Sequence, residues 1–265
     1  MELLQIIVLA LIQGLTEFLP VSSSAHLLLV PVFTDWPDQG LAFDVALHIG
    51  SLAAVIIYFR QDIWRMIFAW GDSVIHRRLS DDGRLAWGVI LGTIPVGLAG
   101  LFAKDLVESV MRFPLFCAFG LIFFGVFLGW ADWRHNGERS EYAMNWRDVL
   151  WIGLAQALAL IPGTSRSGIT MTAALFLGLS REGAARFSFL LSIPVIALAG
   201  VLKTYDLVRA ETSVDWAVLG LGALVSGVSA FLCIHYFLAF IKRIGMQPFV
   251  AYRITLGILL LILFW

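Results

Sequence analysis

The sequence from residue 13 to residue 26 reads Gln13-Gly-Leu-Thr-Glu17-Phe-Leu-Pro20-Val-Ser22-Ser23-Ser24-Ala-His26, and apolar sequence flanks it on both sides. A carboxylate, three consecutive hydroxyls, an imidazole and a proline therefore lie between two hydrophobic segments. An ionisable group at membrane depth costs about 2.5–3.5 kcal/mol on insertion scales, so it is a candidate for a functional site. We treat this stretch as the first half of such a site.

A second polar stretch interrupts the apolar sequence further along the chain. It reads Pro162-Gly163-Thr164-Ser165-Arg166-Ser167-Gly168-Ile-Thr170. The two stretches align on their prolines, which pairs Pro20-Val-Ser-Ser23 with Pro162-Gly-Thr-Ser165. The first stretch brings a carboxylate and the second brings a cation, so we expect the two to form one site.

The composition is that of a membrane protein. The chain has 265 residues, of which 60% are hydrophobic and only 14% are charged, against about 25% charged in an average soluble domain. Long apolar runs in such a chain predict an all-α polytopic membrane protein. The formal net charge of -1 gives no indication of a nucleic-acid partner, and we expect none. The two cysteines, Cys117 and Cys233, lie in apolar runs and are expected to be free packing residues.

Six segments are long enough to be predicted as transmembrane helices: 41–59, 85–103, 113–131, 187–202, 216–241 and 248–265. Four others (3–15, 27–33, 149–161 and 169–179) are too short, because 13 helical residues reach only about 20 Å and the hydrocarbon core is about 30 Å thick. The short segments flank the two polar stretches, so we predict two re-entrant helical hairpins with a polar tip each. The segment 60–84 is amphipathic and charge-rich, and is predicted to be a surface helix or loop.

The same order of short and long segments occurs twice, with an offset near 142 residues. Interrupted short segments at corresponding positions of two halves are typical of inverted-topology repeats. We therefore predict one membrane domain, 1–265, with repeat halves of approximately 1–131 and 149–265.

The distribution of Lys and Arg predicts the orientation of this domain. The loops 60–84, 132–148, 180–186 and 242–247 carry 12 of these residues, and the loops 34–40, 104–112 and 203–215 carry 4. The positive-inside rule places the first group in the cytoplasm and both chain termini outside. The hairpins then enter from opposite faces, and their tips can meet in the middle of the membrane.

In the first polar stretch, Gln13 and Glu17 are four residues apart and share a helix face. Ser22 is expected to cap the helix that follows, and Ser23 and His26 share a face of its first turn. If the site holds a phosphate group, either Ser23 or His26 could attack its phosphorus atom. Glu17 could bind a divalent ion, act as a general base or orient His26.

In the second polar stretch, Thr164 or Ser165 is expected to cap a helix whose first turn carries Arg166 and Thr170 on one face. Two helix N-termini that point into one cavity form an anion site, and Arg166 adds a fork of N–H donors suited to phosphate oxygens. Asp44, together with Gln13, could help hold a hard cation, which prefers oxygen ligands.

A phosphate group handled inside a lipid-facing protein indicates that the rest of the substrate is a lipid chain. We therefore expect hydrolysis of a phosphate ester on a lipid. The alternative is a flippase or transporter of a phosphorylated lipid, which would use the same repeat and anion site. A transporter needs the cation and the helix dipoles but no nucleophile, so the residues Glu17, Ser23 and His26 favour the enzyme.

At these residues the sequence resembles the undecaprenyl-diphosphate phosphatase family of the bacitracin-resistance type. Residues 13–26 match its Glu/Gln-x-x-x-Glu helix and Pro-Val-Ser-Ser-x-x-His turn, and residues 162–170 match its Pro-Gly-x-Ser-Arg-Ser-Gly-x-Thr motif. The resemblance covers essentially the whole chain. It implies an enzyme of the bacterial plasma (inner) membrane that removes the terminal phosphate of undecaprenyl diphosphate. The product would be the monophosphate carrier of peptidoglycan synthesis.

The resemblance also implies roles for particular residues, an active site that opens to the outer, periplasmic side, and a divalent cation, Mg²⁺ or Ca²⁺. The catalytic set would be Glu17, Ser23, His26 and Arg166, and the substrate-binding set would be Gln13, Ser22, Ser165, Ser167 and Thr170. The first position of the Glu/Gln-x-x-x-Glu pair is Gln13 here, which favours Asp44 beside Glu17 as a metal ligand. The resemblance leaves open whether serine or histidine is the nucleophile.

Plainer roles compete with these functional ones. Arg166 could be only the structural ion-pair partner of Glu17, holding two hairpins together. His48 is expected to be a satisfied core residue. Arg253 is expected to face a neighbouring helix or to extend its charged end to the membrane surface.

Two glycine pairs in the predicted spans, Gly88/Gly92 and Gly125/Gly129, have the Gly-x-x-x-Gly spacing of close helix packing. We expect them to bring helices together within the chain. A homodimer through one of them remains open.

Overall fold

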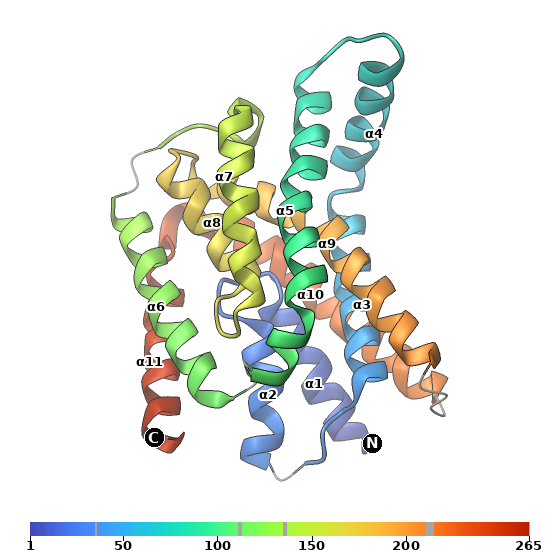
Figure 1. The fold of residues 1–265 in the computed structure, drawn as a ribbon, viewed down its shortest axis with the longest axis vertical. Coiled ribbons are helices and arrows are strands. Elements are labelled where there is room, and N and C mark those ends of the chain that lie inside the picture. The colour runs from blue at the N-terminus through green and yellow to red at the C-terminus, as the bar shows by residue number, and fades with distance from the viewer. Residues whose placement is uncertain (35, 111–112, 135–136, 210–214, 265) are drawn as a thin grey trace.

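The computed structural model describes residues 1–34, 36–110, 113–134, 137–209 and 215–264. In this part of the chain the regular elements are helices, ordered from the N-terminus as in Figure 1. They are α1 (Leu3–Thr16), α2 (Ser23–Thr34), α3 (Leu41–Tyr58), α4 (Arg60–Ile75), α5 (Asp81–Val110), α6 (Pro114–Trp133), η1 (Glu141–Ala143), α7 (Trp146–Ala157), η2 (Leu158–Leu160), α8 (Arg166–Phe176), α9 (Arg181–Arg209), α10 (Trp216–Ile244) and α11 (Gln247–Phe264).

Six of these helices (α3, α5, α6, α9, α10 and α11) are long and apolar enough to cross a membrane. Many of their large side chains are exposed, among them Phe102 and Trp216. An apolar surface of this extent is typical of a membrane-facing protein. The prediction of an all-α, multi-pass membrane protein with six spans is confirmed.

The observed helices extend beyond some of the predicted segments. Helix α9 begins at Arg181, six residues before the predicted start, and α5 continues to Val110. Pro95 lies inside α5 and Pro194 inside α9. The surface segment 60–84 forms α4, which pairs with the first part of α5 and projects from the bundle (Figure 1). Trp265, at the end of the last predicted span, lies outside the described residues.

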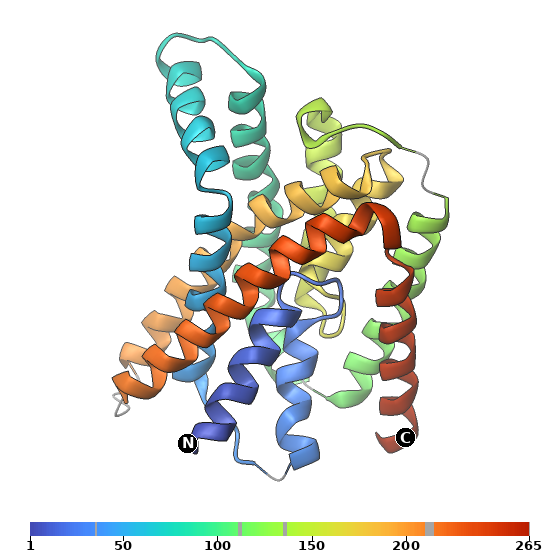
Figure 2. The same cartoon turned by 180° about the vertical axis from the view of Figure 1, so that it is seen from behind.

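The short segments form two helical hairpins, α1–α2 and α7–α8. They come from opposite ends of the molecule, and their turns lie side by side in its middle (Figures 1 and 2). Helix α1 packs on α10 of the second half, and α7 packs on α5 of the first half. The two hairpins are as expected, while their re-entry into a membrane, the symmetry of the two halves and the half boundaries stay predictions.

Small residues allow the first hairpin to approach the bundle closely. A Cβ atom at Gly14 of α1 would lie 2.4 Å from the backbone oxygen of Ser226 in α10. The two Gly-x-x-x-Gly pairs also pack within the chain, since Gly92 faces Leu191 and Gly125 faces Arg253. They serve internal packing as expected, and the homodimer stays a prediction.

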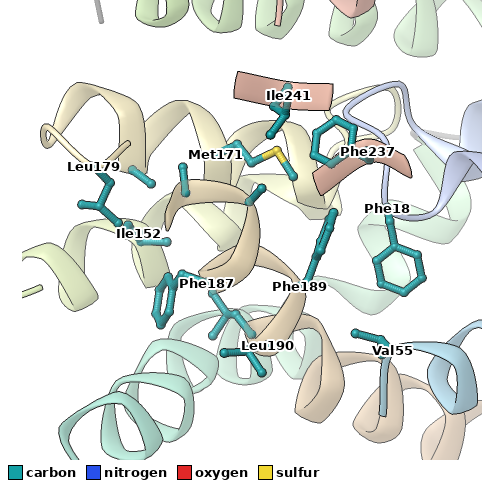
Figure 3. Packing of buried hydrophobic residues seen from close by; sticks show 14 of the residues in the cluster. Phe18, Val55, Ile152, Met171, Leu179, Phe187, Phe189, Leu190, Phe237 and Ile241 are labelled. Carbon is teal, nitrogen blue, oxygen red and sulfur yellow. The ribbon is translucent and has the colours of Figure 1, made fainter. Parts of the chain in front are cut away.

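The largest buried cluster of side chains lies directly beside the first hairpin turn (Figure 3). Phe18 is fully buried and meets Phe189 of α9 edge to face, with 5.3 Å between the ring centres. Phe189 in turn packs on Phe237 of α10. Because Phe18 follows Glu17 directly, this packing fixes the position of the carboxylate.

Charged side chains from several segments meet at one end of the molecule. Helix α4, η1 and the start of α9 gather at one end, and both chain termini lie at the other (Figures 1 and 2). At the first end, ion pairs connect the start of α9 to the ends of two other helices. Arg181 pairs with Asp132 of α6 at 2.6 Å, and Lys242 of α10 pairs with Glu182. The basic loops that the orientation prediction grouped together thus share one end of the fold.

Candidate functional site

Each hairpin turn contains a residue in the left-handed backbone region directly before its second helix. Ser22 precedes α2 with φ of 72°, and Ser165 precedes α8 with φ of 69°. Such a conformation costs about 1–3 kcal/mol for a residue with a side chain and is concentrated at functional sites. The equivalent positions are therefore Ser22 and Ser165, whereas alignment on the prolines pairs Ser22 with Thr164. The second turn is one residue longer than the sequence alignment assumed.

The second hairpin turn is capped and tied to the first by serine hydroxyls. The Ser165 Oγ accepts a hydrogen bond from the Gly168 N–H at 3.1 Å, which confirms Ser165 as the cap. The Ser167 Oγ donates to the Leu19 carbonyl of the first turn at 2.9 Å. The N-termini of α2 and α8 thus lie close to each other, and the N–H groups that remain uncapped in their first turns are near the same point.

An ion pair joins the two turns. The Arg166 Nη2 lies 3.0 Å from the Glu17 Oε1, and its Nη1 donates to the Ser188 carbonyl of α9 at 3.1 Å. The two charged side chains are only 11% and 8% exposed. The guanidinium also lies over the Phe18 ring at 5.9 Å. The structure therefore brings together the two groups that the sequence predicted to share a site.

The other carboxylate oxygen of Glu17 is held by a hydroxyl and an amide. The Ser23 Oγ donates to the Glu17 Oε2 at 2.6 Å, and the Gln13 Nε2 donates to the same oxygen at 3.1 Å. A hydroxyl within hydrogen-bonding distance of a carboxylate is the arrangement of a nucleophile and its base. The predicted placement of Gln13 and Glu17 on one helix face is observed, and Ser23 joins them from the other arm of the hairpin.

The candidate His26, and His48, which was expected to be a core residue, are both placed differently from expectation. The His26 Nδ1 pairs with the Ser22 carbonyl at 2.7 Å, and its Nε2 with the Tyr252 hydroxyl of α11 at 2.5 Å. No hydrogen bond or ion pair joins His26 to Glu17 within the described ranges. Instead the His48 Nε2, from α3, lies 3.9 Å from the Glu17 Oε2. The expectation that His48 is only a core residue is wrong, since it is partly exposed and borders the site.

The remaining predicted substrate-binding hydroxyls are directed to their own neighbours. The Thr170 Oγ1 bonds to the Arg166 carbonyl at 2.9 Å and to the Ser188 hydroxyl at 2.8 Å. The Ser22 Oγ lies 3.3 Å from the Ser24 Oγ. In contrast, the buried Thr164 Oγ1 has no hydrogen-bond partner among the described residues, so the second turn contains one unpaired hydroxyl.

Sequence reasoning assigned Arg253 to a helix contact or to the membrane surface, and the second assignment is wrong. Arg253 is completely buried, and its guanidinium donates to backbone carbonyls of α6 and of both hairpin turns. The five acceptors, at 2.9–3.3 Å, are the carbonyl oxygens of Pro20, Gly120, Leu121, Gly163 and Thr164. A charge in an apolar span was the signal that could have identified it.

Removing these bonds should disrupt both turns together. We expect Arg253→Met to lower the apparent melting temperature in detergent by about 10 °C, because each buried carbonyl left without a donor costs about 1–3 kcal/mol. Alkylation of the buried Cys117, which lies beneath Gly163, should become faster. The matched control for a lost arginine is Arg181→Met, which removes the ion-pair partner of Asp132 and no bond to a hairpin turn. An unchanged melting temperature and unchanged alkylation of Cys117 would contradict the bridging role of Arg253.

Comparison with known proteins agrees with this site. Residues 6–259 match the family model described as bacitracin resistance protein BacA. The chain belongs to this family. Undecaprenyl-diphosphatase 2 of Stutzerimonas stutzeri is 60% identical over 267 residues, covering all of this chain and 99% of that protein. Undecaprenyl-diphosphatases of Nitrosococcus oceani and Thioalkalivibrio sulfidiphilus are 57% and 58% identical, each over the full length of both chains.

A divalent cation, which resemblance to the BacA family implies, can be tested against the oxygen atoms present. The Asp44 carboxylate accepts a hydrogen bond from Gln39 at 2.9 Å, and nothing in the described residues joins it to Glu17. No group of three His, Cys, Asp or Glu side chains there could hold a metal. However, the buried Gln13 Oε1 has no partner beside Glu17. One carboxylate and one amide oxygen fit a Mg²⁺ or Ca²⁺ ion whose other ligands are substrate phosphates and water.

Proposed function

We infer that this protein is an integral-membrane undecaprenyl-diphosphatase, which removes the terminal phosphate of undecaprenyl diphosphate and leaves undecaprenyl phosphate as the recycled lipid carrier. The observation that carries this function is the convergence of Ser23, Glu17 and Arg166 from two separate hairpins. Relatives named undecaprenyl-diphosphatase match the chain over its full length.

We propose that the terminal phosphate binds between the two hairpin turns. Arg166 has five N–H donors, of which two serve Glu17 and Ser188, so others remain for phosphate oxygens. The N-termini of α2 and α8 add partial positive charge. The free hydroxyl of Thr164 supplies one more donor. Charge neutralisation and positioning are the main requirements of phosphoryl transfer.

Ser23 is proposed as the nucleophile and Glu17 as its base. As the Ser23 Oγ forms a bond to the terminal phosphorus, its proton passes to the Glu17 Oε2 and the bond from phosphorus to the bridging oxygen breaks. The electron pair of that bond leaves with undecaprenyl phosphate. Glu17 gives this proton to the departing undecaprenyl phosphate and is again a carboxylate. Water then attacks the phosphoserine while it gives a proton to Glu17, and the bond from phosphorus to the Ser23 Oγ breaks. The Ser23 oxygen takes the proton from Glu17 as phosphate leaves, which restores both residues. Arg166 stabilises the negative charge in both steps.

His26 is not placed for the same role, because both of its ring nitrogens already have partners. The Nδ1 is hydrogen-bonded to the Ser22 carbonyl and the Nε2 to the Tyr252 hydroxyl. The 2.6 Å contact between Ser23 and Glu17 also favours a hydrolase over a flippase, because a carrier needs no activated hydroxyl. In this proposal His26 positions the start of α2 against α11.

The active site is proposed to open to the outer side of the plasma membrane, with both termini outside. The support for this orientation is the positive-inside rule, applied to the basic end that carries α4, η1 and the start of α9. The termini lie at the opposite end (Figure 2).

The test of the function is phosphate release by the purified protein in detergent, with farnesyl or undecaprenyl diphosphate as substrate. A bound divalent ion would be held by Glu17 and Gln13 and would neutralise charge on the diphosphate. We expect chelation with EDTA to lower the rate at least about ten-fold, and Mg²⁺ or Ca²⁺ to restore it. Gln13→Glu, which adds a second carboxylate, should lower the metal concentration needed for half-maximal rate.

Absence of phosphate release from every isoprenyl diphosphate, under all metal conditions, would overturn the enzyme and favour the flippase. Full activity after chelation, with no response to added metal in Gln13→Glu, would overturn the metal assignment alone.

A further inference from the structure

An apolar groove of about 360 Å³ runs between α3 and α9, two helices that pack against each other (Figure 1). Its walls come from two faces, one on each helix. The lining residues are His48, Ile49 and Leu52 of α3, and Ile196, Ala197, Gly200, Val201 and Thr204 of α9. Its volume falls within the range of about 300–1,000 Å³ that is typical of ligand sites.

The groove and the candidate active site meet at one residue, His48. His48 lines the groove, and its Nε2 lies 3.9 Å from the Glu17 Oε2. The ring is held in this place by a hydrogen bond of 2.7 Å between its Nδ1 and the Asp44 carbonyl. A ligand whose phosphate lies beside Glu17 therefore has an apolar path directly past His48.

We propose that this groove binds the isoprenoid segment next to the diphosphate of the substrate. The proposal rests on the proposed function, because the head group must lie at Glu17 for the chain to enter here. A second apolar hollow, bordered by α4, α5 and α9, has none of the site residues in its lining. Of these two hollows, only the groove at His48 offers a path that begins at the reacting phosphate.

One of the residues that line the groove is a glycine at which an added Cβ meets no neighbour. A Cβ atom at Gly200 would have no heavy atom within 4 Å. A larger side chain at this position should therefore extend into the groove and leave the packing of α9 unchanged. Gly220 of α10 is the matched control, since a Cβ there also meets nothing and it does not line the groove.

The experiment compares Gly200→Leu and Gly220→Leu with three substrates: isopentenyl, farnesyl and undecaprenyl diphosphate. Isopentenyl diphosphate carries one isoprene unit, too short to pass far beyond His48. We expect Gly200→Leu to lower kcat/KM at least about ten-fold for the two longer substrates and by less than about two-fold for isopentenyl diphosphate, as for a filled apolar pocket. Gly220→Leu should change none of the three.

An equal loss for all three substrates, or no loss for any, would overturn the groove as the chain site. A second measurement keeps the test independent of how Gly200→Leu folds. Alkylation of Gly200→Cys should be slowed at least about five-fold by undecaprenyl phosphate and left unchanged by inorganic phosphate, because only the first carries an apolar chain to exclude the reagent. Equal alkylation rates would likewise overturn the proposal. Failure of the unmodified protein to release phosphate from any substrate would instead overturn the function itself.

Discussion

Ser23→Ala is expected to lower kcat/KM for phosphate release by at least about 1,000-fold, because the nucleophile of a covalent mechanism has no substitute in the site. The Ser23 hydroxyl is the one that donates to the Glu17 Oε2, at 2.6 Å. Loss of this single, partly buried hydroxyl should change the melting temperature only slightly. The measurement is the initial rate of phosphate release, with thermal unfolding in detergent as the check on folding.

Ser24→Ala is the matched control, since Ser24 is the next residue of the same helix. Its Oγ contacts the Ser22 hydroxyl and not the Glu17 carboxylate. It should keep most of the activity. Acid quenching of a single turnover with labelled substrate separates the two candidate nucleophiles, because phosphoserine survives acid and phosphohistidine does not. Acid-labile label, together with an active Ser23→Ala variant, would show that His26 carries the phosphate.

The membrane-spanning architecture could be predicted because the signals are local. Apolar length identified the six spans, and the short arms followed from the same measure. The pairing of Glu17 with Arg166 could be predicted because burying either charge alone would be costly. Both groups are close to prolines that mark the turns, so their place at the hairpin tips was visible in the sequence.

The identity of the histidine near Glu17 could not be predicted in the same way. His26 is three residues from Ser23, and this spacing suggested a shared role. In the structure its ring stacks with Tyr252, with 5.6 Å between the ring centres, and Tyr252 is 226 residues away in sequence. His48 reaches Glu17 because α3 packs on α9 and α10. Which face of a helix is turned inward depends on that packing, which the local pattern does not contain.

The role of Arg253 depends on the same kind of distant contact. Its backbone acceptors lie on α6 and on two turns separated by more than 130 residues. Gly125 of α6 leaves the space for its side chain, since a Cβ there would lie 3.3 Å from the Arg253 Cβ. The sequence shows a charge in an apolar span, but only the packing of α11 on α6 shows which carbonyls receive its hydrogen bonds.

Arg166→Lys should lower kcat/KM by about 100-fold while the protein remains folded. Lysine keeps the charge but presents a single nitrogen, so it cannot serve Glu17, Ser188 and two phosphate oxygens at once. Loss of one donor to the transition state typically costs about 100-fold to 1,000-fold in rate. The measurement is kcat/KM, with the melting temperature as the check on the ion pair to Glu17.

Arg181→Lys provides the control, because the partly exposed Arg181 also forms an ion pair with a buried carboxylate, that of Asp132 at 2.6 Å, away from the candidate site. This variant should lose stability comparably and keep its activity. If Arg166 were only a structural partner of Glu17, the two lysine variants would behave alike, and Arg166→Lys would retain near-normal kcat/KM. A selective loss of activity in Arg166→Lys alone is what a guanidinium that binds the phosphate requires, because the charge and the fold are the same in both proteins.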